Sequence, residues 1–109
     1  MGLRRGDIAI LSAPGDYGKP RPALVIQSDT FHLLDSVIVA LLTTHLQAEP
    51  ALSRKRIAPT DGNGLSRESE VMLDKLLTMP RRKVSDAIGH LSSTEMVEIS
   101  SALALILDL

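Results

Sequence analysis

The chain has 109 residues, of which 44% are apolar, and a formal net charge of −1. This length predicts one domain over residues 1–109, and the apolar content excludes an intrinsically disordered protein. Since no cysteine is present, the sequence excludes a disulfide framework and thiolate chemistry, and the cytoplasm is the simplest location. No apolar run approaches the roughly 18 residues of a membrane-spanning helix, and the charged start of the chain is unlike a signal peptide. We therefore expect no membrane association.

Short strands dominate the first half of the chain. Residues 7–13 alternate Ile8 and Ile10 with polar or small neighbours, which is typical of a strand with one buried face. Turn-forming residues at 14–18 predict a loop. Residues 23–27 form an apolar run typical of a strand buried on both faces, and residues 36–43 form a second such run, which we expect to be the central strand.

A polar stretch follows the second predicted strand. Ser28 and Asp29 fit the start of a short helical turn that reaches Leu34. We expect Gln27 to bridge strand backbone or to cap this turn, and Asp29 to accept hydrogen bonds from nearby amides. Both roles are structural.

The second half of the chain alternates weaker strands with turns. The pattern predicts a charged strand at residues 54–58, a turn at residues 61–64, a strand at residues 70–76, and a short irregular element with a last strand within residues 83–91. About five short strands followed by one helix predict a small curled antiparallel sheet or barrel.

The C-terminal helix carries the clearest signal. Ser92 fits the N-cap of a capping box, with Glu95 at the third helical position. Four apolar residues then recur at spacings of three and four and give one helical face, namely Met96, Ile99, Leu103 and Ile106. Leu105 and Leu107 widen this face, so we expect the sheet or a partner to cover the last two turns.

Arg21 has the most informative surroundings of any charged residue. Pro20 and Pro22 flank it and fix the backbone φ at about −65°. A guanidinium is always charged and presents a planar fork of donors suited to phosphate, and a rigid backbone pre-organises it for an anion or a transition state. The same pattern also fits an ordinary surface arginine in a stiff loop before an edge strand.

Basic residues fall in four groups, namely Arg4–Arg5, Lys19 with Arg21, Arg54–Arg56, and Arg81–Lys83. Groups that converge on one face would suit RNA phosphates or an acidic protein segment, whereas groups that stay apart are solvated turns. With Tyr17 and Phe31 as the two aromatic residues, an aromatic platform for stacking bases is not expected.

An ordered set of motifs resembles the MazF/PemK family of bacterial toxins and covers nearly the whole chain. The set comprises Arg5–Asp7, the run RPALVIQSD from Arg21 to Asp29, the apolar strand that ends in Leu42-Thr43-Thr44, the turn at Gly64–Leu65, Val71–Lys75, and Gly89–Leu91 before the helix. The resemblance implies an SH3-like small barrel of about five to six antiparallel strands with a C-terminal helix, mainly β, assembled as a homodimer.

The resemblance also implies an activity. Members of this family are the endoribonuclease halves of toxin–antitoxin pairs. The implied reaction is sequence-selective, metal-independent cleavage of single-stranded RNA (mRNA) with no cofactor, by 2′-hydroxyl attack that leaves a 2′,3′-cyclic phosphate and a 5′-hydroxyl. The implied partners are a cognate acidic antitoxin, which blocks the same groove, and a second copy of the chain.

Two residues receive catalytic roles from the resemblance, Arg21 and Thr43. Arg21 would stabilise the phosphate, and Thr43 would donate its hydroxyl to a phosphate oxygen. From the residues alone, Thr43 is better read as a β-branched residue at the end of a strand. Three scattered histidines offer neither a general acid–base pair nor a zinc-binding spacing, so no metal site is expected.

Further residues are implied around this pair. Asp16 lies where many relatives carry a loop glutamate and could take the 2′-hydroxyl proton, although it equally fits a turn residue. Asp74 could support the site or pair with Arg21, although Met72 stands where PemK-like members often carry an arginine. The candidates for RNA contact are Lys19, Tyr17 and His45, and His45 also fits an exposed loop histidine.

The sequence is also consistent with two other functions. Toxins of the CcdB type share the expected fold but poison DNA gyrase by binding, which would make Arg21 dispensable. A catalytically silent barrel that only binds an antitoxin or nucleic acid is the other, because the loop glutamate and the PemK-type arginine are both replaced.

Overall fold

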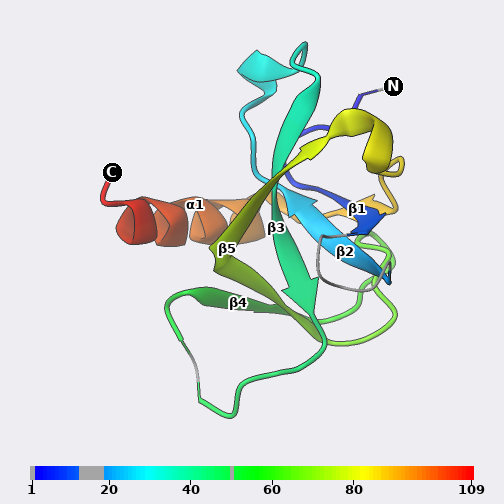
Figure 1. Ribbon diagram of the computed structural model, residues 1–109. Coiled ribbons are helices and arrows are strands. Elements are labelled where there is room, and N and C mark those ends of the chain that lie inside the picture. Colours follow the sequence, from blue (N-terminus) through cyan, green and yellow to red (C-terminus); the bar gives the residue numbers. More distant parts are fainter. Residues whose placement is uncertain (1, 13–18, 50) are drawn as a thin grey trace.

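The computed structural model describes residues 2–12, 19–49 and 51–109, and in these the chain forms one antiparallel sheet and one C-terminal α-helix. The sheet has the order β4-β5-β3-β2-β1-β6 (Figure 1). Its strands are β1 (Asp7–Ser12), β2 (Pro20–Val25), β3 (Ser36–Thr43), β4 (Arg54–Ile57), β5 (Ser69–Pro80) and β6 (Gly89–His90), followed by the helix α1 (Ser93–Leu107). The expected mainly β fold with a C-terminal helix is confirmed.

Strand β5 is longer than the sequence pattern predicts, because it runs through Pro80 instead of ending at Leu76. Its first part pairs with β4 and with the end of β3, and its second part pairs with the start of β3. The register between β3 and β5 shifts at Ala40–Leu42. An irregularity of this kind bends a strand and increases its twist, so one long strand curls the sheet around its core.

Strand β2 begins and ends earlier than the expected range of 23–27. Pro20 and Pro22 belong to the strand because both are paired in register with β1. At the other end, the Gln27 side chain replaces a backbone ladder: its Oε1 accepts from the Ile38 amide at 3.2 Å, and its Nε2 donates to the Phe31 carbonyl at 3.2 Å. The expected bridging role of Gln27 is confirmed.

A short 3-10 turn, η1 (Asp29–Phe31), follows β2, and a second, η2 (Arg81–Lys83), follows β5. The Ser28 side chain caps η1 by accepting from the Thr30 amide. Asp29 Oδ1 accepts from the Arg5 amide at 2.8 Å. Both residues therefore hold the local backbone, as expected from the sequence.

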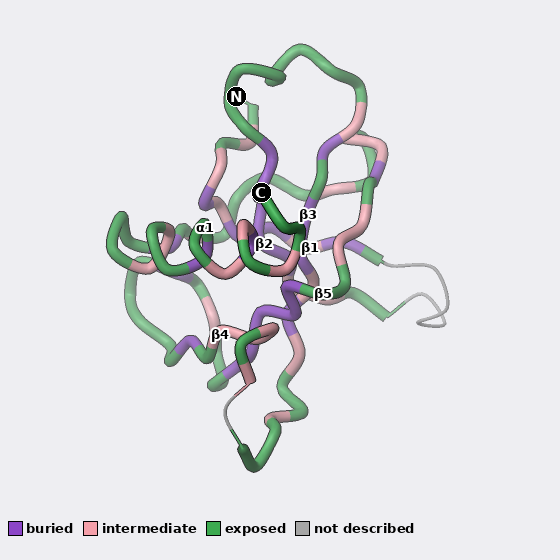
Figure 2. Tube along the Cα trace, turned by 90° about the vertical axis from the view of Figure 1, so that its left-hand side faces the viewer, coloured by how far each residue is buried: buried purple, intermediate pink, exposed green. Residues whose placement is uncertain are grey.

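Apolar residues are buried on both faces of the sheet. The larger cluster packs beneath α1 and contains Ile8, Leu24, Leu42, Val71, Leu73, Ile99 and Leu103 among others, while the smaller contains Leu11, Ala23, Val25, Val37, Val39 and Met79. Figure 2 shows these buried positions in the central strands, with exposed residues in the connections. Alternate residues of β2 belong to opposite clusters, which explains its continuous apolar sequence.

Helix α1 begins with the expected capping box, in which Ser92 and Glu95 satisfy each other's backbone amides. Ile99 and Leu103 are buried against the sheet. Leu105 and Leu107 are 64% and 49% exposed, so the sheet does not cover this part of the helix. In the described part of the chain, no helix is both long and apolar enough to cross a membrane.

Candidate active site between β2 and β3

A proline interrupts the ladder between β2 and β3 and opens a pocket there. The Ile26 amide donates to the Ile38 carbonyl at 3.1 Å, so every second residue counted back from Ile26 directs its backbone toward β3. Pro22 is one of these residues and has no N–H to donate. Beyond it lies a pocket of about 260 Å³, lined by Lys19, Pro20, Arg21, Pro22, Leu42, Thr43, Thr44 and Ser69.

Arg21 and Thr43, the two residues to which the resemblance gives catalytic roles, both line this pocket. The register pairs Ala23 with Leu41, and extending it by two residues places Arg21 directly opposite Thr43. Facing residues at adjacent strands have neighbouring side chains. The Thr43 Oγ1 accepts from the His45 amide at 3.1 Å. A hydroxyl that accepts one bond still has its own proton to donate, so Thr43 can contact an anion in the pocket.

The next strand adds a carboxylate that the sequence analysis did not single out. Glu70 is paired with Thr43 on one side and with Arg56 on the other. Its side chain is 6% exposed and bonds to two arginines, with Arg54 Nη1 at 3.0 Å from Oε1 and Arg56 Nη2 at 2.8 Å from Oε2. Arg21, Thr43, Glu70 and Arg56 thus form a line across four strands, called the polar row below.

The Glu70 carboxylate remains ionised in this setting. Burial by itself raises its pKa, but hydrogen bonds from Arg56 and Arg54, the Gln47 amide, and the charge of Arg56 together outweigh burial. The pKa of Glu70 is therefore lowered from its ordinary value of 4.5. With its oxygens bonded to guanidinium and amide groups, Glu70 acts as an anchor rather than as a proton acceptor.

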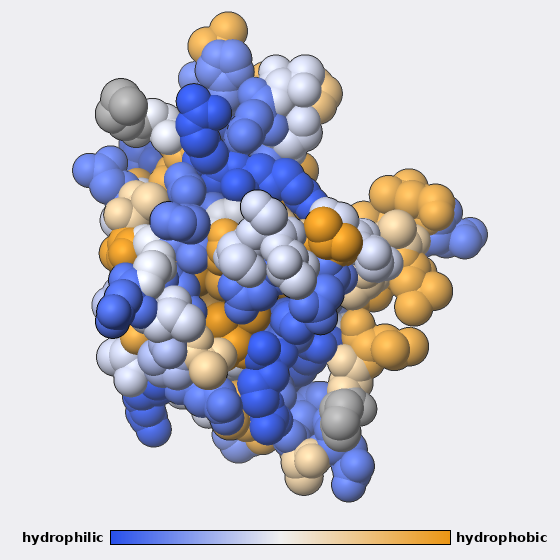
Figure 3. All heavy atoms as spheres, turned by 180° about the vertical axis from the view of Figure 1, so that it is seen from behind, coloured by the Kyte–Doolittle hydropathy of each residue, from blue (hydrophilic) through white to orange (hydrophobic). Residues whose placement is uncertain are grey.

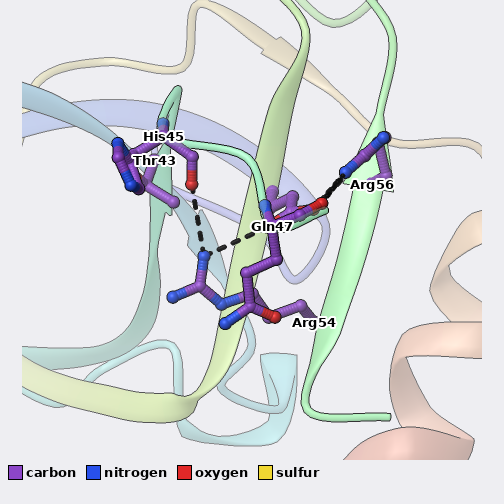
Figure 4. Close-up of polar contacts among 6 residues, drawn as sticks. Thr43, His45, Gln47, Arg54 and Arg56 are labelled. Carbon is purple, nitrogen blue, oxygen red and sulfur yellow. Dashed lines mark hydrogen bonds and ion pairs between the residues drawn. The ribbon is translucent and has the colours of Figure 1, made fainter. Parts of the chain in front are cut away.

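The same arginines hold the chain segment that leaves β3 after Thr43 (Figure 4). Arg54 Nη1 donates to the His45 carbonyl at 3.5 Å, and Arg56 Nη2 donates to the Gln47 carbonyl at 2.7 Å. The Gln47 amide in turn donates to Glu70 Oε1 at 3.2 Å. These contacts fix the backbone on which the Thr43 hydroxyl depends.

The structure places the other candidate residues differently. Lys19 lines the pocket, whereas the His45 side chain is exposed beyond it. Asp74 is exposed on β5 and does not line this pocket. Asp16 and Tyr17 lie outside the described residues. Among the described residues, no group of three or more histidine, aspartate or glutamate side chains could hold a metal ion.

Of the four basic groups, two converge on the polar row and two support the fold elsewhere. Arg5 donates to the Ile26 carbonyl and, at 2.7 Å, to the Ser100 hydroxyl of α1. Arg81 donates to the Leu34 carbonyl at 2.6 Å. Lys19 with Arg21 and Arg54 with Arg56 belong to the pocket and the row. The convergence expected as one alternative is therefore partial.

Comparison with known proteins decides the family. The family model described as PemK-like, MazF-like toxin of type II toxin–antitoxin systems matches residues 4–107. This chain belongs to that family. It is 44% identical over 108 residues, 98% of each chain, to a protein of Mycolicibacterium smegmatis named as a probable endoribonuclease MazF. The resemblance seen in the sequence motifs is thereby confirmed.

Solved structures of the MazF type share the fold. The Mycobacterium tuberculosis toxin MazF-mt6 superposes with a TM-score of 0.79 at 25% identity, over 94% of this chain and 97% of that chain. An endoribonuclease from a mycobacterial species, solved in complex with its cognate antitoxin, gives a TM-score of 0.80 at 21% identity, over 98% of this chain and 96% of that chain. The curled sheet with its C-terminal helix is therefore the MazF architecture.

Proposed function

We propose that this chain is an endoribonuclease toxin that cleaves single-stranded RNA sequence-selectively and without a metal ion, at the pocket between β2 and β3. The observation that carries the proposal is that Arg21 and Thr43 line one pocket, just beyond the point where the pairing of β2 with β3 ends. The relative named as a probable endoribonuclease supports the substrate class.

The proposed reaction is an internal transfer at phosphorus. The ribose 2′-oxygen attacks the adjacent phosphorus, the 2′-O–P bond forms, and the P–O5′ bond breaks. The 2′-hydroxyl proton passes to a base, and the departing 5′-oxygen takes up a proton, which leaves a 2′,3′-cyclic phosphate and a 5′-hydroxyl. Charge builds up on the phosphoryl oxygens in between, so fixed donors that point at these oxygens lower the barrier.

Arg21 and Thr43 supply these donors in the proposal. A guanidinium keeps its charge at any working pH, so we assign Arg21 to electrostatic stabilisation rather than to proton transfer. The Thr43 hydroxyl, oriented by the His45 amide, donates to a phosphoryl oxygen. We keep the remaining roles from the family resemblance: Asp16 as the base, Asp74 in support of the site, and Lys19, Tyr17 and His45 in RNA contact.

We further propose that a cognate acidic antitoxin segment occupies the same pocket and so blocks RNA. An acidic, disordered segment can place carboxylates against Arg21 and bury apolar surface as it folds. The structural relative solved with its cognate antitoxin supports the existence of such a partner for this fold.

We also propose a homodimer formed through a groove at the end of α1, away from the polar row. This apolar groove has a volume of about 560 Å³ and is lined by Phe31, Leu34, Ile38, Leu76, Leu103 and Leu107 among others. Figure 3 shows apolar side chains at its right-hand edge, where α1 ends. The patch combines a recess with the protruding Leu109, which is 91% exposed. A two-fold interface requires a self-complementary surface, and a recess beside a projection provides one.

The proposed cleavage is tested with EDTA-treated protein on a long single-stranded RNA. We expect discrete cuts by the wild-type protein and none by Arg21→Ala, with both proteins folded by circular dichroism. An absence of cuts by a folded wild-type protein would contradict the proposal and favour a toxin that acts by binding alone.

A further inference from the structure

We propose that Arg54 and Arg56, held in place by Glu70, form a binding subsite for an RNA backbone phosphate beside the cleaved one. This subsite rests on the proposed ribonuclease function and extends it from the reacting phosphate to a neighbouring one. The Lys19 and Arg21 group alone would hold the RNA at one point, whereas two points fix its direction across the sheet.

Arg56 lies on the same line of paired residues as Thr43. Arg56 pairs with Glu70, and Glu70 pairs with Thr43, so the cluster continues the line of Arg21 and Thr43 across the sheet. Neighbouring strands are about 4.8 Å apart, which puts the backbone of Arg56 roughly 10 Å from that of Thr43. A strand of RNA whose reacting phosphate sits between Arg21 and Thr43 can pass over the cluster in one direction along the row.

The cluster of Arg54, Arg56 and Glu70 has an excess of positive charge. Two guanidinium groups surround one carboxylate, which leaves a net charge of +1. The Glu70 oxygens already accept from Arg54 Nη1, from Arg56 Nε and Nη2, and from the Gln47 amide. Among the described residues, Arg56 Nη1 and Arg54 Nε and Nη2 have no acceptor. These donors are the ones that an incoming phosphate oxygen would use.

The cluster also forms part of a pocket. Arg54, Arg56 and Glu70 line a pocket of about 230 Å³ together with Ala48 and Ala51, whose side chains are small. Arg56 is 46% exposed, while Arg54 is 16% exposed. Because the buried Glu70 fixes both guanidinium groups, little side-chain entropy remains to be lost on binding. Arg56 is therefore the phosphate contact, and Glu70 is its positioning residue.

The residue between the two arginines, Lys55, provides a matched control. Lys55 points to the other face of β4 and pairs with Glu98 of α1 at 2.7 Å. Lys55→Gln and Arg56→Gln each remove one positive charge from adjacent positions of one strand. A general electrostatic effect weakens RNA binding equally in the two variants, whereas a subsite is lost only with Arg56.

The test measures the affinity for a single-stranded RNA that carries 2′-deoxyribose at the mapped cut, over a range of salt concentrations. Each phosphate contact to a single strand adds about 0.7 to the slope of log affinity against log salt. We expect Arg56→Gln to reduce the slope by about this amount and Lys55→Gln to leave it unchanged. Ala48→Glu, which adds a carboxylate to the lining of the pocket without removing an arginine, is expected to weaken binding as well.

Several results would overturn the subsite. Equal slopes for the two glutamine variants, or unaltered RNA binding by a folded Ala48→Glu, exclude it while normal RNA cleavage leaves the proposed function in place. Weaker binding of poly-glutamate by Arg56→Gln with an unchanged RNA slope would assign the cluster to an acidic protein segment instead. A wild-type protein that cuts no RNA would remove both proposals together.

Discussion

The polar row and the apolar groove differ in how their side chains are held. In the row, Glu70 is almost fully buried, and its bonds to two arginines also fix the backbone that leaves Thr43. In the groove, Phe31 and Leu107 are 54% and 49% exposed, so each turns about half of its surface to solvent. The side chains of the row are held by contacts within one chain, whereas those of the groove remain partly exposed.

This difference separates the two tasks that we propose for the molecule. Donors fixed before the substrate arrives need no reorganisation during the reaction, which suits the row to catalysis. Covering exposed apolar surface removes it from water, which is favourable, so the groove suits contact with a protein partner. Substitutions in one region should therefore leave the property of the other region unchanged.

The largest expected effect is that of Arg21→Ala on cleavage. Loss of one charged donor at the developing phosphoryl charge is expected to lower kcat by about 10³-fold. Single-turnover cleavage of the mapped RNA measures it, and sedimentation of the variant should match that of the wild-type protein. A variant that loses its oligomeric state together with its activity would break the separation of the two regions.

Thr43→Val is expected to have the next largest effect. The substitution keeps the β-branched shape at the end of β3 but removes the hydroxyl, so we expect a fall in kcat of about 100-fold. Thr43→Ser serves as the control because it keeps the hydroxyl that accepts from the His45 amide. If the serine and valine variants cleave equally well, the hydroxyl has no role in the reaction.

Leu107→Asp tests the role of the apolar groove in dimer formation. A carboxylate in the apolar groove is costly to bury, so we expect the dimer to weaken by tenfold or more. Light scattering across a dilution series gives the dissociation constant. Leu52→Asp is the matched control, because Leu52 is also exposed but lies outside the groove. Equal dimerisation of both variants would place the interface elsewhere.

Glu70→Gln is expected to alter the pH dependence of stability. The pKa of Glu70 is lowered in the folded state, so its ionised form stabilises the fold above the ordinary value of 4.5, and this contribution disappears as the pH falls through the lowered folded-state pKa. Denaturant unfolding of the wild-type protein should therefore lose more free energy over this acid range than unfolding of Glu70→Gln. Parallel pH profiles for the two proteins would show that Glu70 is not held as an ion pair.

Glu98→Gln is expected to have the smallest effect. Its partner is Lys55, and Glu98 is 53% exposed. An ion pair of this kind contributes roughly 0–1 kcal/mol to stability, so the free energy of unfolding and the cleavage rate should hardly change. A destabilisation well above this range would show that Lys55 and Glu98 contribute more than an exposed ion pair does.

The sequence was sufficient for most of the fold because its signals are local. The capping box at Ser92 and the apolar run at residues 36–43 each lie within one element, and both were confirmed in place. The length of β5 was underestimated at residues 77–80, because this part of the strand pairs with the start of β3 beyond the register shift. That pairing joins residues far apart in the sequence, which a local pattern does not contain.

The Arg54–Glu70–Arg56 cluster could not be predicted in the same way. Its members meet through the pairing of β4 with β5, and that register depends on the whole hairpin. One signal was present, since two arginines separated by one residue share a face of a strand and need a nearby anion when partly buried. For Arg21 and Thr43, family resemblance supplied the pair, and the structure adds that Pro22 opens the pocket between them.

The most direct test of the account is the chemistry of the RNA ends produced in EDTA. The wild-type protein is predicted to leave 2′,3′-cyclic phosphate and 5′-hydroxyl ends, and a single 2′-deoxyribose at the mapped site should abolish that cut alone. Ends that carry a 5′-phosphate, or unimpaired cleavage of the 2′-deoxy substrate, would contradict 2′-hydroxyl attack at the polar row.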